Sequence, residues 1–296
     1  MRSLKLFGVL VLLVQLSQQA AIDNRIVNGK KVSIEDYPYQ VSLFRKNLDG
    51  SIRFFCGGSI ISKKCILTAG HCAVKPDENS EKTWTYITPE EVSVLPGKAS
   101  TLDSSSAISA EKINVHPNFQ ATFIFKNHKL IGGTLAENDI AVIFLKKLLE
   151  YSTSIAKISL PPQGESESIF YGKVAVATGF GLTYNSISTT DLYAVNLTIS
   201  KTNTLCHNNE MICLAEQENQ RGTCSGDSGG PLVINKVQYG ISSAIFNPTD
   251  PLVCQKSSEF IFVNIIHYRE WISKNSDVDE ADDVIGEDLR GNGIEE

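Results

Sequence analysis

The chain has 296 residues, of which 42% are hydrophobic and 20% are charged, and its formal net charge is −6. This composition is typical of globular domains and excludes collagen, coiled coil and wholesale disorder. The mild acidity gives no electrostatic basis for nucleic-acid binding, so no nucleic-acid partner is expected. Nine acidic residues lie in the stretch 275–296, and without its two ends the chain is neutral over 26–274.

The N-terminus has the features of a secretory signal over residues 1–20. Arg2 and Lys5 precede an apolar run, and the small residues Ala20 and Ala21 offer a cleavage site. The apolar run is too short to span a bilayer, and a buried N-terminal helix is the alternative interpretation. We therefore expect a secreted, extracellular protein with no membrane association, in which the oxidising environment favours paired cysteines.

A short polar stretch over 21–25 follows, and it ends at Arg25 just before the apolar pair Ile26 and Val27. A protease could cut after Arg25 and leave Ile26 as a new N-terminus. An ordinary loop that leads into a strand is the other interpretation of these residues.

Several segments predict β-structure. Tyr39 to Phe44 alternates in polarity as a half-buried strand does. Val174 to Thr178 and Val233 to Ser242 are rich in β-branched residues, and a hairpin-like Asn235-Lys236 divides the second of these runs. Asn264 can cap a terminal helix. The apolar face of that helix would contain Ile265, Tyr268, Trp271 and Ile272. These patterns alone predict only a mostly-β protein.

Three further segments carry the residue types that acyl transfer requires. They are Leu67-Thr68-Ala69-Gly70-His71-Cys72, Glu137-Asn138-Asp139-Ile140-Ala141-Val142 and Cys224-Ser225-Gly226-Asp227-Ser228-Gly229-Gly230-Pro231-Leu232. Each has a purely structural explanation as a turn or a packed residue. Together they supply a serine hydroxyl, an imidazole that can take its proton and a carboxylate that can orient the imidazole. The glycines allow backbone N–H groups to approach a developing oxyanion.

These segments resemble the trypsin/chymotrypsin family of secreted serine endopeptidases, and the resemblance runs from Ile26 to about Ile272. It also rests on Arg25-Ile26-Val27-Asn28-Gly29, Cys56-Gly57-Gly58-Ser59 and Gly179-Phe180-Gly181. It implies an all-β fold of two antiparallel β-barrels, with the active site between them and a C-terminal helix. The chain would then comprise a signal peptide (1–20), an activation propeptide (21–25), a protease domain (26–274) and an acidic tail (275–296). The tail is expected to be solvated and disordered, with a regulatory or binding role as the alternative.

The resemblance implies catalytic roles. Ser228 would be the nucleophile, His71 the general base and then acid, and Asp139 the residue that orients His71. The backbone N–H groups of Gly226 and Ser228 would form the oxyanion hole. Gly70 replaces the alanine that is usual before His71.

The family is made as a zymogen. Cleavage after Arg25 would free the ammonium of Ile26 to pair with Asp227, because a buried carboxylate requires such a partner. The implied partners are a protein or peptide substrate, a protease that cuts after Arg25, and protein inhibitors. A monomer is expected.

Family positions also imply three disulfides. These are Cys56–Cys72, Cys206–Cys213 and Cys224–Cys254. Cys65 is left over, and its apolar neighbours favour a buried, inert thiol, with an intermolecular disulfide as the alternative. No cysteine–histidine set has the spacing of zinc ligands, and the family's calcium loop lacks paired acids here, so no metal or other cofactor is expected. Asn196 begins a possible glycosylation sequon within a strand-like run.

The predicted substrate pocket departs from the family. Gly222, followed by Thr223, stands at its base, so no carboxylate is available for a Lys or Arg side chain of the substrate. Ser243 keeps the usual residue of the substrate-pairing strand, whereas Ile245 and Phe260 replace pocket glycines and should fill much of the cavity. The pocket is expected to admit only Gly, Ala or Ser or to be closed, unless the loop reroutes and preserves a pocket.

Two functions follow as hypotheses. The first is an active endopeptidase that hydrolyses peptide bonds through a Ser-His-Asp triad and an acyl-enzyme, with a small or restricted preference at P1, the substrate residue before the cleaved bond. The second is a catalytically silent homologue that acts as a binding or decoy protein because its primary pocket is plugged. Long connections over 73–91 and 119–137 would flank the cleft near His71 and restrict which substrates enter.

Overall fold

The computed structural model describes residues 26, 29–47, 49–77, 79–126, 129–133, 136–182, 190–200, 209–214, 217, 221–246 and 259–278. The predicted signal peptide, the propeptide with Arg25, the tail beyond residue 278, and both Cys206 and Cys254 lie outside the described residues.

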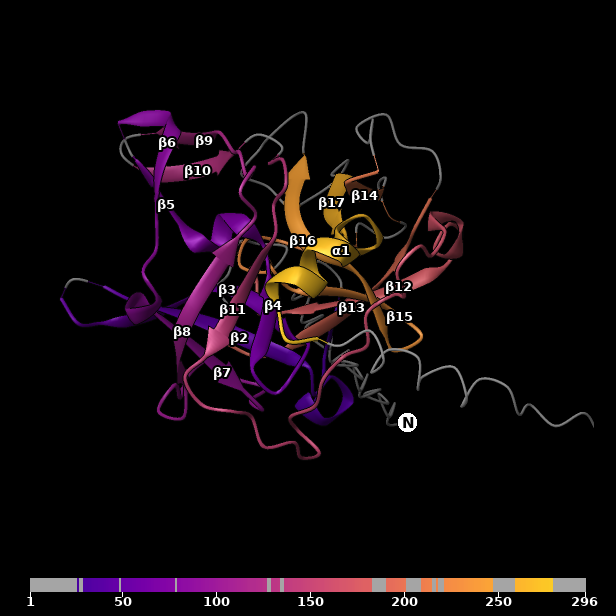
Figure 1. Ribbon diagram of the computed structural model, residues 1–296, viewed down its shortest axis with the longest axis horizontal. Coiled ribbons are helices and arrows are strands. Elements are labelled where there is room, and N and C mark those ends of the chain that lie inside the picture. The colour runs from indigo at the N-terminus through magenta and orange to yellow at the C-terminus, as the bar shows by residue number, and fades with distance from the viewer. Residues whose placement is uncertain are drawn as a thin grey trace, which may run out of the picture.

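Six antiparallel strands of the N-terminal half close into a barrel in the order β11-β4-β3-β2-β7-β8 (Figure 1). They are β2 (Gln40–Lys46), β3 (Ile52–Ile60), β4 (Cys65–Thr68), β7 (Val92–Pro96), β8 (Ile108–Val115) and β11 (Ala141–Leu145). Branched aliphatic side chains such as Val41, Leu43 and Ile66 fill the interior and are fully buried. The alternation at 39–44 correctly predicts β2.

Seven strands form the second sheet, in the order β1-β13-β12-β15-β16-β17-β14. They are β1 (Lys30–Lys31), β12 (Val174–Gly179), β13 (Tyr193–Thr198), β14 (Met211–Leu214), β15 (Pro231–Ile234), β16 (Val237–Phe246) and β17 (Glu259–Asn264). The predicted hairpin is confirmed: Asn235 and Lys236 join β15 to β16 with φ values of 48° and 64°, the left-handed conformation that tight hairpins require. The mostly-β architecture and its C-terminal helix match the expected fold class.

The long connections over 73–91 and 119–137 each contain a small β-hairpin, and both hairpins are outside the closed barrel. One contains β5 (Val74–Asp77) and β6 (Ser80–Tyr86), and the other β9 (Phe123–Lys126) and β10 (Lys129–Gly133). The hairpins lie together at one edge of the molecule (Figure 1). In the described part of the chain, 3-10 turns also lie in the connections, at Ile34–Asp36, Gly70–Ala73, Pro89–Glu91 and Glu167–Ile169.

The chain returns to the first barrel through helix α1 (Ile265–Asn275). Asn264 caps it as predicted, because its Oδ1 accepts a hydrogen bond of 3.1 Å from the amide of Ile266. Tyr268 and Ile272 belong to the core of the first barrel, although the helix follows a strand of the second sheet. No helix within the described part of the chain is both long and apolar enough to cross a membrane.

Candidate active site

His71 lies in the 3-10 turn that directly follows β4, and two hydrogen bonds join it to Asp139. Its backbone N–H donates to Asp139 Oδ1 at 2.7 Å, and its ring Nδ1 lies 2.8 Å from Asp139 Oδ2. The second contact leaves Nε2 as the ring nitrogen free to face a nucleophile. About a fifth of the His71 side chain is exposed, at 21%, so solvent and ligands can reach it.

Asp139 lies just before β11 and is only 1% exposed. The hydroxyl of Ser243, on β16 of the second sheet, also donates to its Oδ2 at 2.6 Å. The sequence assigned Ser243 to the substrate-pairing strand alone and did not predict this contact. Nothing local in the sequence signals it, because the two residues are 104 positions apart.

Burial and charge act in opposite directions on this pair. Burial opposes protonation of His71, but the charge of Asp139 and their hydrogen bond outweigh it and raise the pKa of His71. Burial favours the neutral acid at Asp139, but the charge of His71 and the hydrogen bonds from His71 and Ser243 lower the pKa of Asp139. Asp139 is therefore ionised at neutral pH and stabilises a protonated imidazole.

Ser228 lies in a tight turn before β15, where Gly226 and Gly229 have φ values of 100° and 79°. These left-handed conformations favour glycine. The turn is fixed from both sheets, because Gly57 N–H donates to Ser228 O at 2.8 Å and Gly229 N–H donates to Ser242 O at 2.7 Å.

Within the described residues, the backbone N–H groups of Gly226 and Ser228 donate no hydrogen bond. Two such groups are the donors that an oxyanion hole needs. In the same part of the chain, no hydrogen bond joins the hydroxyl of Ser228 to His71.

Asp227 is fully buried beside Ser228. Its two carboxylate oxygens accept backbone N–H bonds of 2.8 Å from Gly181 and Cys224. Gly179 and Gly181 leave room for it, since a Cβ at Gly179 would fall 2.1 Å from Oδ1 and one at Gly181 2.5 Å from Cγ. Burial raises the pKa of Asp227 to about 7, and no cationic side chain among the described residues offsets that effect.

Ile26 is also fully buried, in the core of the second sheet. Its φ of 37° is one that β-branched residues avoid.

The base of the predicted substrate pocket is occupied. A Cβ at Gly222 would fall 1.8 Å from Cζ of Phe260, so the Phe260 ring rests directly on this glycine. Phe260 is 3% exposed and pairs across the sheet with Ile245, which packs against the same core. Thr223, next to Gly222, is buried as well.

The bonding state of each described cysteine is the one that the sequence predicts. Cys56 and Cys72 form a disulfide, and their sulfurs lie within 4.8 Å of a ring nitrogen of His71. Cys213 and Cys224 are disulfide-bonded, while their expected partners Cys206 and Cys254 lie outside the described residues. Cys65 is a free, buried thiol, and burial raises its pKa to about 12. Asn196 lies on β13 with an exposed side chain.

The chain is similar to known proteases over most of its length. The trypsin family model matches residues 26–272. A chymotrypsin from Phaedon cochleariae is 32% identical over 85% of this chain and 82% of its own length. Chymotrypsin-2 from Vespa crabro is 32% identical over 84% and 99%, and trypsin 5G1 from Aedes aegypti is 25% identical over 85% of both chains.

A solved structure titled HL collagenase superposes with a TM-score of 0.62 at 23% identity. The superposition covers 85% of this chain and 99% of the collagenase chain, and it supports the assignment of the fold. The family match spans the segments that contain His71, Asp139 and Ser228. The chain therefore belongs to the trypsin family of serine endopeptidases.

Proposed function

We propose that this endopeptidase acts through Ser228, His71 and Asp139. Ser228 Oγ attacks the carbonyl carbon of the peptide bond while His71 Nε2 takes its proton, and His71 then gives the proton to the leaving amine. The acyl-enzyme is hydrolysed by water, which His71 activates in the same way. The observation that carries this proposal is the double contact of Asp139 with the backbone N–H and the Nδ1 of His71, because it fixes both the tautomer and the orientation of the ring.

The tetrahedral oxyanion binds to the N–H groups of Gly226 and Ser228. Both groups lie in the glycine-rich turn and have no hydrogen-bond acceptor among the described residues. Each donor of this kind contributes roughly 3–4 kcal/mol to transition-state stabilisation in related chemistry.

Activation by cleavage after Arg25 is part of the proposal. The buried Asp227 has backbone donors but no described cationic partner, and such a carboxylate is costly without one. The Ile26 side chain already lies in the core, at a φ that suits it poorly. A free ammonium at Ile26 would relieve both conditions by releasing the backbone restraint and pairing with Asp227. The absence of a Ser228–His71 hydrogen bond fits a catalytic site that is completed by this step.

The enzyme accepts only small residues at P1. Phe260 takes the space above Gly222 in which a larger substrate side chain would lie, and Ile245 narrows the entrance from the neighbouring strand. Without a carboxylate at Gly222 or Thr223, a basic side chain would have no partner. The pairing of Ile245 with Phe260 argues against a rerouted strand at this position.

We place the mature protein outside the cell as a monomer, with protein or peptide substrates, protein inhibitors and an activating protease as its partners. The sequence features of residues 1–20 and the cysteines already bonded at 56, 72, 213 and 224 support this location. Asn196 is exposed and could carry a glycan.

A non-enzymatic binding or decoy role is the second candidate, and the Phe260 ring on Gly222 is the observation that favours it. A protein whose primary pocket is fully closed would bind protein partners through the loops around the pocket and would not cleave them.

Peptide-library cleavage after activation at Arg25 separates the two functions, with Ser228→Ala as the control. The endopeptidase should cleave after Gly, Ala or Ser, and its Ser228 should react with a fluorophosphonate. Cleavage after large or basic residues would keep the triad but overturn the pocket assignment. No cleavage and no label, with Ile26 verified as the N-terminus, would support the decoy.

A further inference from the structure

Asp139 is held by the residue that precedes it. Asn138 has a φ of 50°, and its carbonyl oxygen accepts a 2.8 Å hydrogen bond from the amide of Ile140. Asparagine tolerates this left-handed conformation better than most residues, because its side chain can hydrogen-bond locally. The sharp turn directs the Asp139 carboxylate inward, where it meets His71.

Both ends of the Asn138 amide are engaged. Nδ2 donates to the backbone oxygen of Asn118 at 3.1 Å, and Oδ1 accepts from the hydroxyl of Tyr268 at 3.2 Å. Asn118 lies in the connection between β8 and β9, whereas Tyr268 lies on helix α1, which follows the last strand of the second sheet. The turn before Asp139 is therefore held by hydrogen bonds to two separate segments, the one at Asn118 and helix α1.

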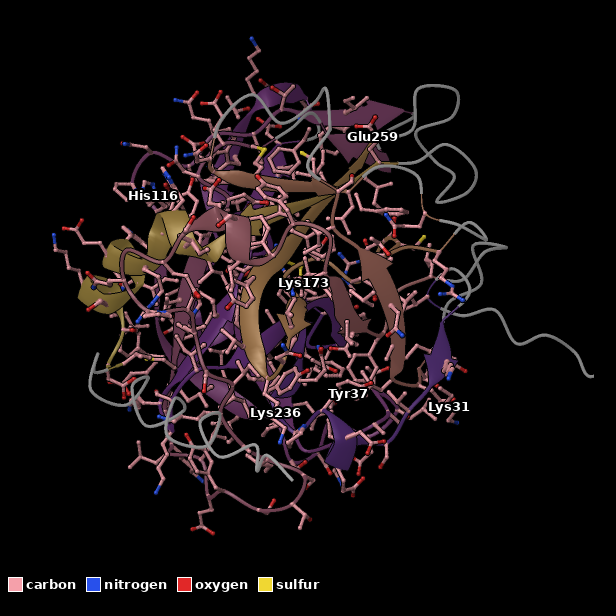
Figure 2. The ribbon with its side chains drawn as sticks, turned by 90° about the vertical axis from the view of Figure 1, so that its right-hand side faces the viewer. Lys31, Tyr37, His116, Lys173, Lys236 and Glu259 are labelled. Atoms are coloured by element: carbon pink, nitrogen blue, oxygen red, sulfur yellow. A yellow bond between two sulfur atoms is a disulfide. The ribbon has the colours of Figure 1, made fainter. Side chains whose placement is uncertain are left out.

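Tyr268 is itself firmly placed. It is 3% exposed, and its ring packs edge-on against His116 at 5.6 Å and against His267 at 4.7 Å between ring centroids. His116 lies beside α1 (Figure 2) and also contacts Trp271 on that helix. The backbone N–H of His116 donates to Ile140 O at 3.1 Å. Helix α1 is therefore connected to the residue before Asp139 through Tyr268, and to the residue after it through His116.

The hydroxyl of Tyr268 remains a donor whenever the enzyme works. Burial raises its pKa, and the carboxylates of Glu210, Asp139 and Glu137 raise it further. The hydroxyl therefore stays protonated and can donate its hydrogen bond to Asn138.

We propose that Tyr268 is a positioning residue for the reaction, and that it acts through Asn138 to fix the backbone from which Asp139 reaches His71. The inference rests on the proposed role of the triad. It assigns to the C-terminal helix a second task beyond covering the barrel. Small displacements matter here, because a shift of about 1 Å in a catalytic group can cost about a hundredfold in rate.

Tyr268→Phe tests this while it keeps the packed ring. One neutral hydrogen bond is lost, and kcat should fall about three- to tenfold with KM within about twofold of wild type. The acid limb of the pH–rate profile should also move to lower pH, because a less well placed Asp139 raises the pKa of His71 by less. Tyr239→Phe is the matched control, because this buried tyrosine donates its hydroxyl hydrogen bond to Glu165, at 3.3 Å. It should change neither readout.

Asn138 provides the second arm. Asn138→Gly keeps access to the left-handed turn but removes the amide that Tyr268 contacts. Adding Tyr268→Phe to Asn138→Gly should then cost nothing more, whereas a full three- to tenfold further loss would show that Tyr268 acts by another route and would overturn the proposal. Thermal unfolding of each variant verifies that it is folded.

A spectroscopic readout keeps this proposal separate from the proposed function. The proton NMR signal of His71 Nδ1–H reports the contact with Asp139 without turnover. It should shift or broaden in Tyr268→Phe and stay unchanged in Tyr239→Phe, even if the activated chain proves inactive. An unchanged signal in Tyr268→Phe, together with unchanged kcat, would reject the positioning role while leaving the triad in place.

Discussion

The residues around Gly70 explain why this position has glycine instead of alanine. A Cβ at this position would lie 2.9 Å from Cδ2 of Phe119, 3.1 Å from the amide nitrogen of Ile140 and 3.3 Å from Oδ1 of Asp139. The alanine usual in the family would therefore overpack this site against the Phe119 ring. Phe119 belongs to the small core beneath the two extra hairpins, so the glycine next to His71 and these hairpins are coupled.

Gly70→Ala should therefore be unfavourable, although it restores the usual residue. Overpacking of this kind typically costs about 1–3 kcal/mol of stability, and here it would also press on the Asp139 loop and lower kcat. Urea unfolding and peptide hydrolysis measure the two effects. In the double variant with Phe119→Leu, the new methyl group gains space, so the cost of Gly70→Ala should shrink. Strict additivity of the two substitutions would contradict the contact.

Phe260 is the second decisive side chain, because its ring lies directly against Gly222 at the base of the predicted pocket. Phe260→Gly should open the space above Gly222 and allow cleavage after larger apolar residues, which the peptide library would detect. Removing a buried aromatic ring costs about 3–5 kcal/mol, so the midpoint of thermal unfolding is measured alongside. Ile245→Gly is the companion variant and should widen the entrance alone. Unchanged P1 preference in folded Phe260→Gly would contradict the assignment of this pocket.

The extra hairpins form a unit through one tryptophan. Trp84 on β6 packs edge-on against Phe119 and Phe123 at 5.4 and 6.2 Å between ring centroids. Phe123 lies on β9, so Trp84 ties one hairpin to the other. Each hairpin has two short strands, and an isolated pair of that size is at best marginally stable in water. Their mutual packing explains why two loops near His71 are ordered strands.

Trp84→Ala should loosen this unit but leave Phe119 in contact with Gly70, because the backbone N–H of Phe119 still donates to His116 O at 3.0 Å. Limited proteolysis should then cut within residues 74–86 or 123–133 faster than in wild type, because local opening becomes easier. Hydrolysis of short peptides should stay within about twofold of wild type. The control is Trp271→Ala on helix α1, which should leave the cutting rate in the hairpins unchanged. Equal cutting rates in Trp84→Ala and wild type would show that the hairpins are stable separately.

The sequence was sufficient for the strands with clear polarity patterns and insufficient for these hairpins. The runs at 39–44, 174–178 and 233–242 and the cap at Asn264 are local signals, and the structure has strands or a helix at each. The hairpins depend on contacts between segments about 40 residues apart, such as Trp84 with Phe119 and Phe123. For the same reason, the sequence did not predict the contacts of Ser243 with Asp139 and of Tyr268 with Asn138, which join residues 104 and 130 positions apart.

The two halves of the molecule meet at the predicted catalytic residues. His71 and Asp139 come from the closed barrel, Ser228 and Ser243 come from the second sheet, and α1 returns from the second sheet to the first barrel. Relative placement of the halves therefore sets the geometry of the site. In the proposed activation, the buried Asp227 next to Ser228 would connect this geometry to the cleavage after Arg25.

Activation should change how the stability of the whole molecule depends on pH. In the uncleaved chain, burial raises the pKa of Asp227 from 3.8 to about 7. The folded state then binds one more proton than the unfolded state between these values, so stability falls as pH rises from about 4 and has lost the full amount above about 7. A shift of this size corresponds to a loss on the order of 4 kcal/mol. Pairing with a free Ile26 ammonium would lower the pKa of Asp227 and remove that loss.

Urea unfolding between pH 5 and pH 8 checks this expectation on two proteins that both carry Ser228→Ala to prevent self-digestion. One keeps the propeptide through Arg25→Gln, and the other is cleaved after Arg25. The uncleaved protein should lose stability towards pH 8, whereas the cleaved protein should not, so the difference between them grows with pH. Asp227→Asn in the uncleaved protein should flatten its dependence, because the titrating group is gone. Parallel curves for the two proteins would mean that Asp227 has the same partners before and after cleavage, and that activation does not act through this carboxylate.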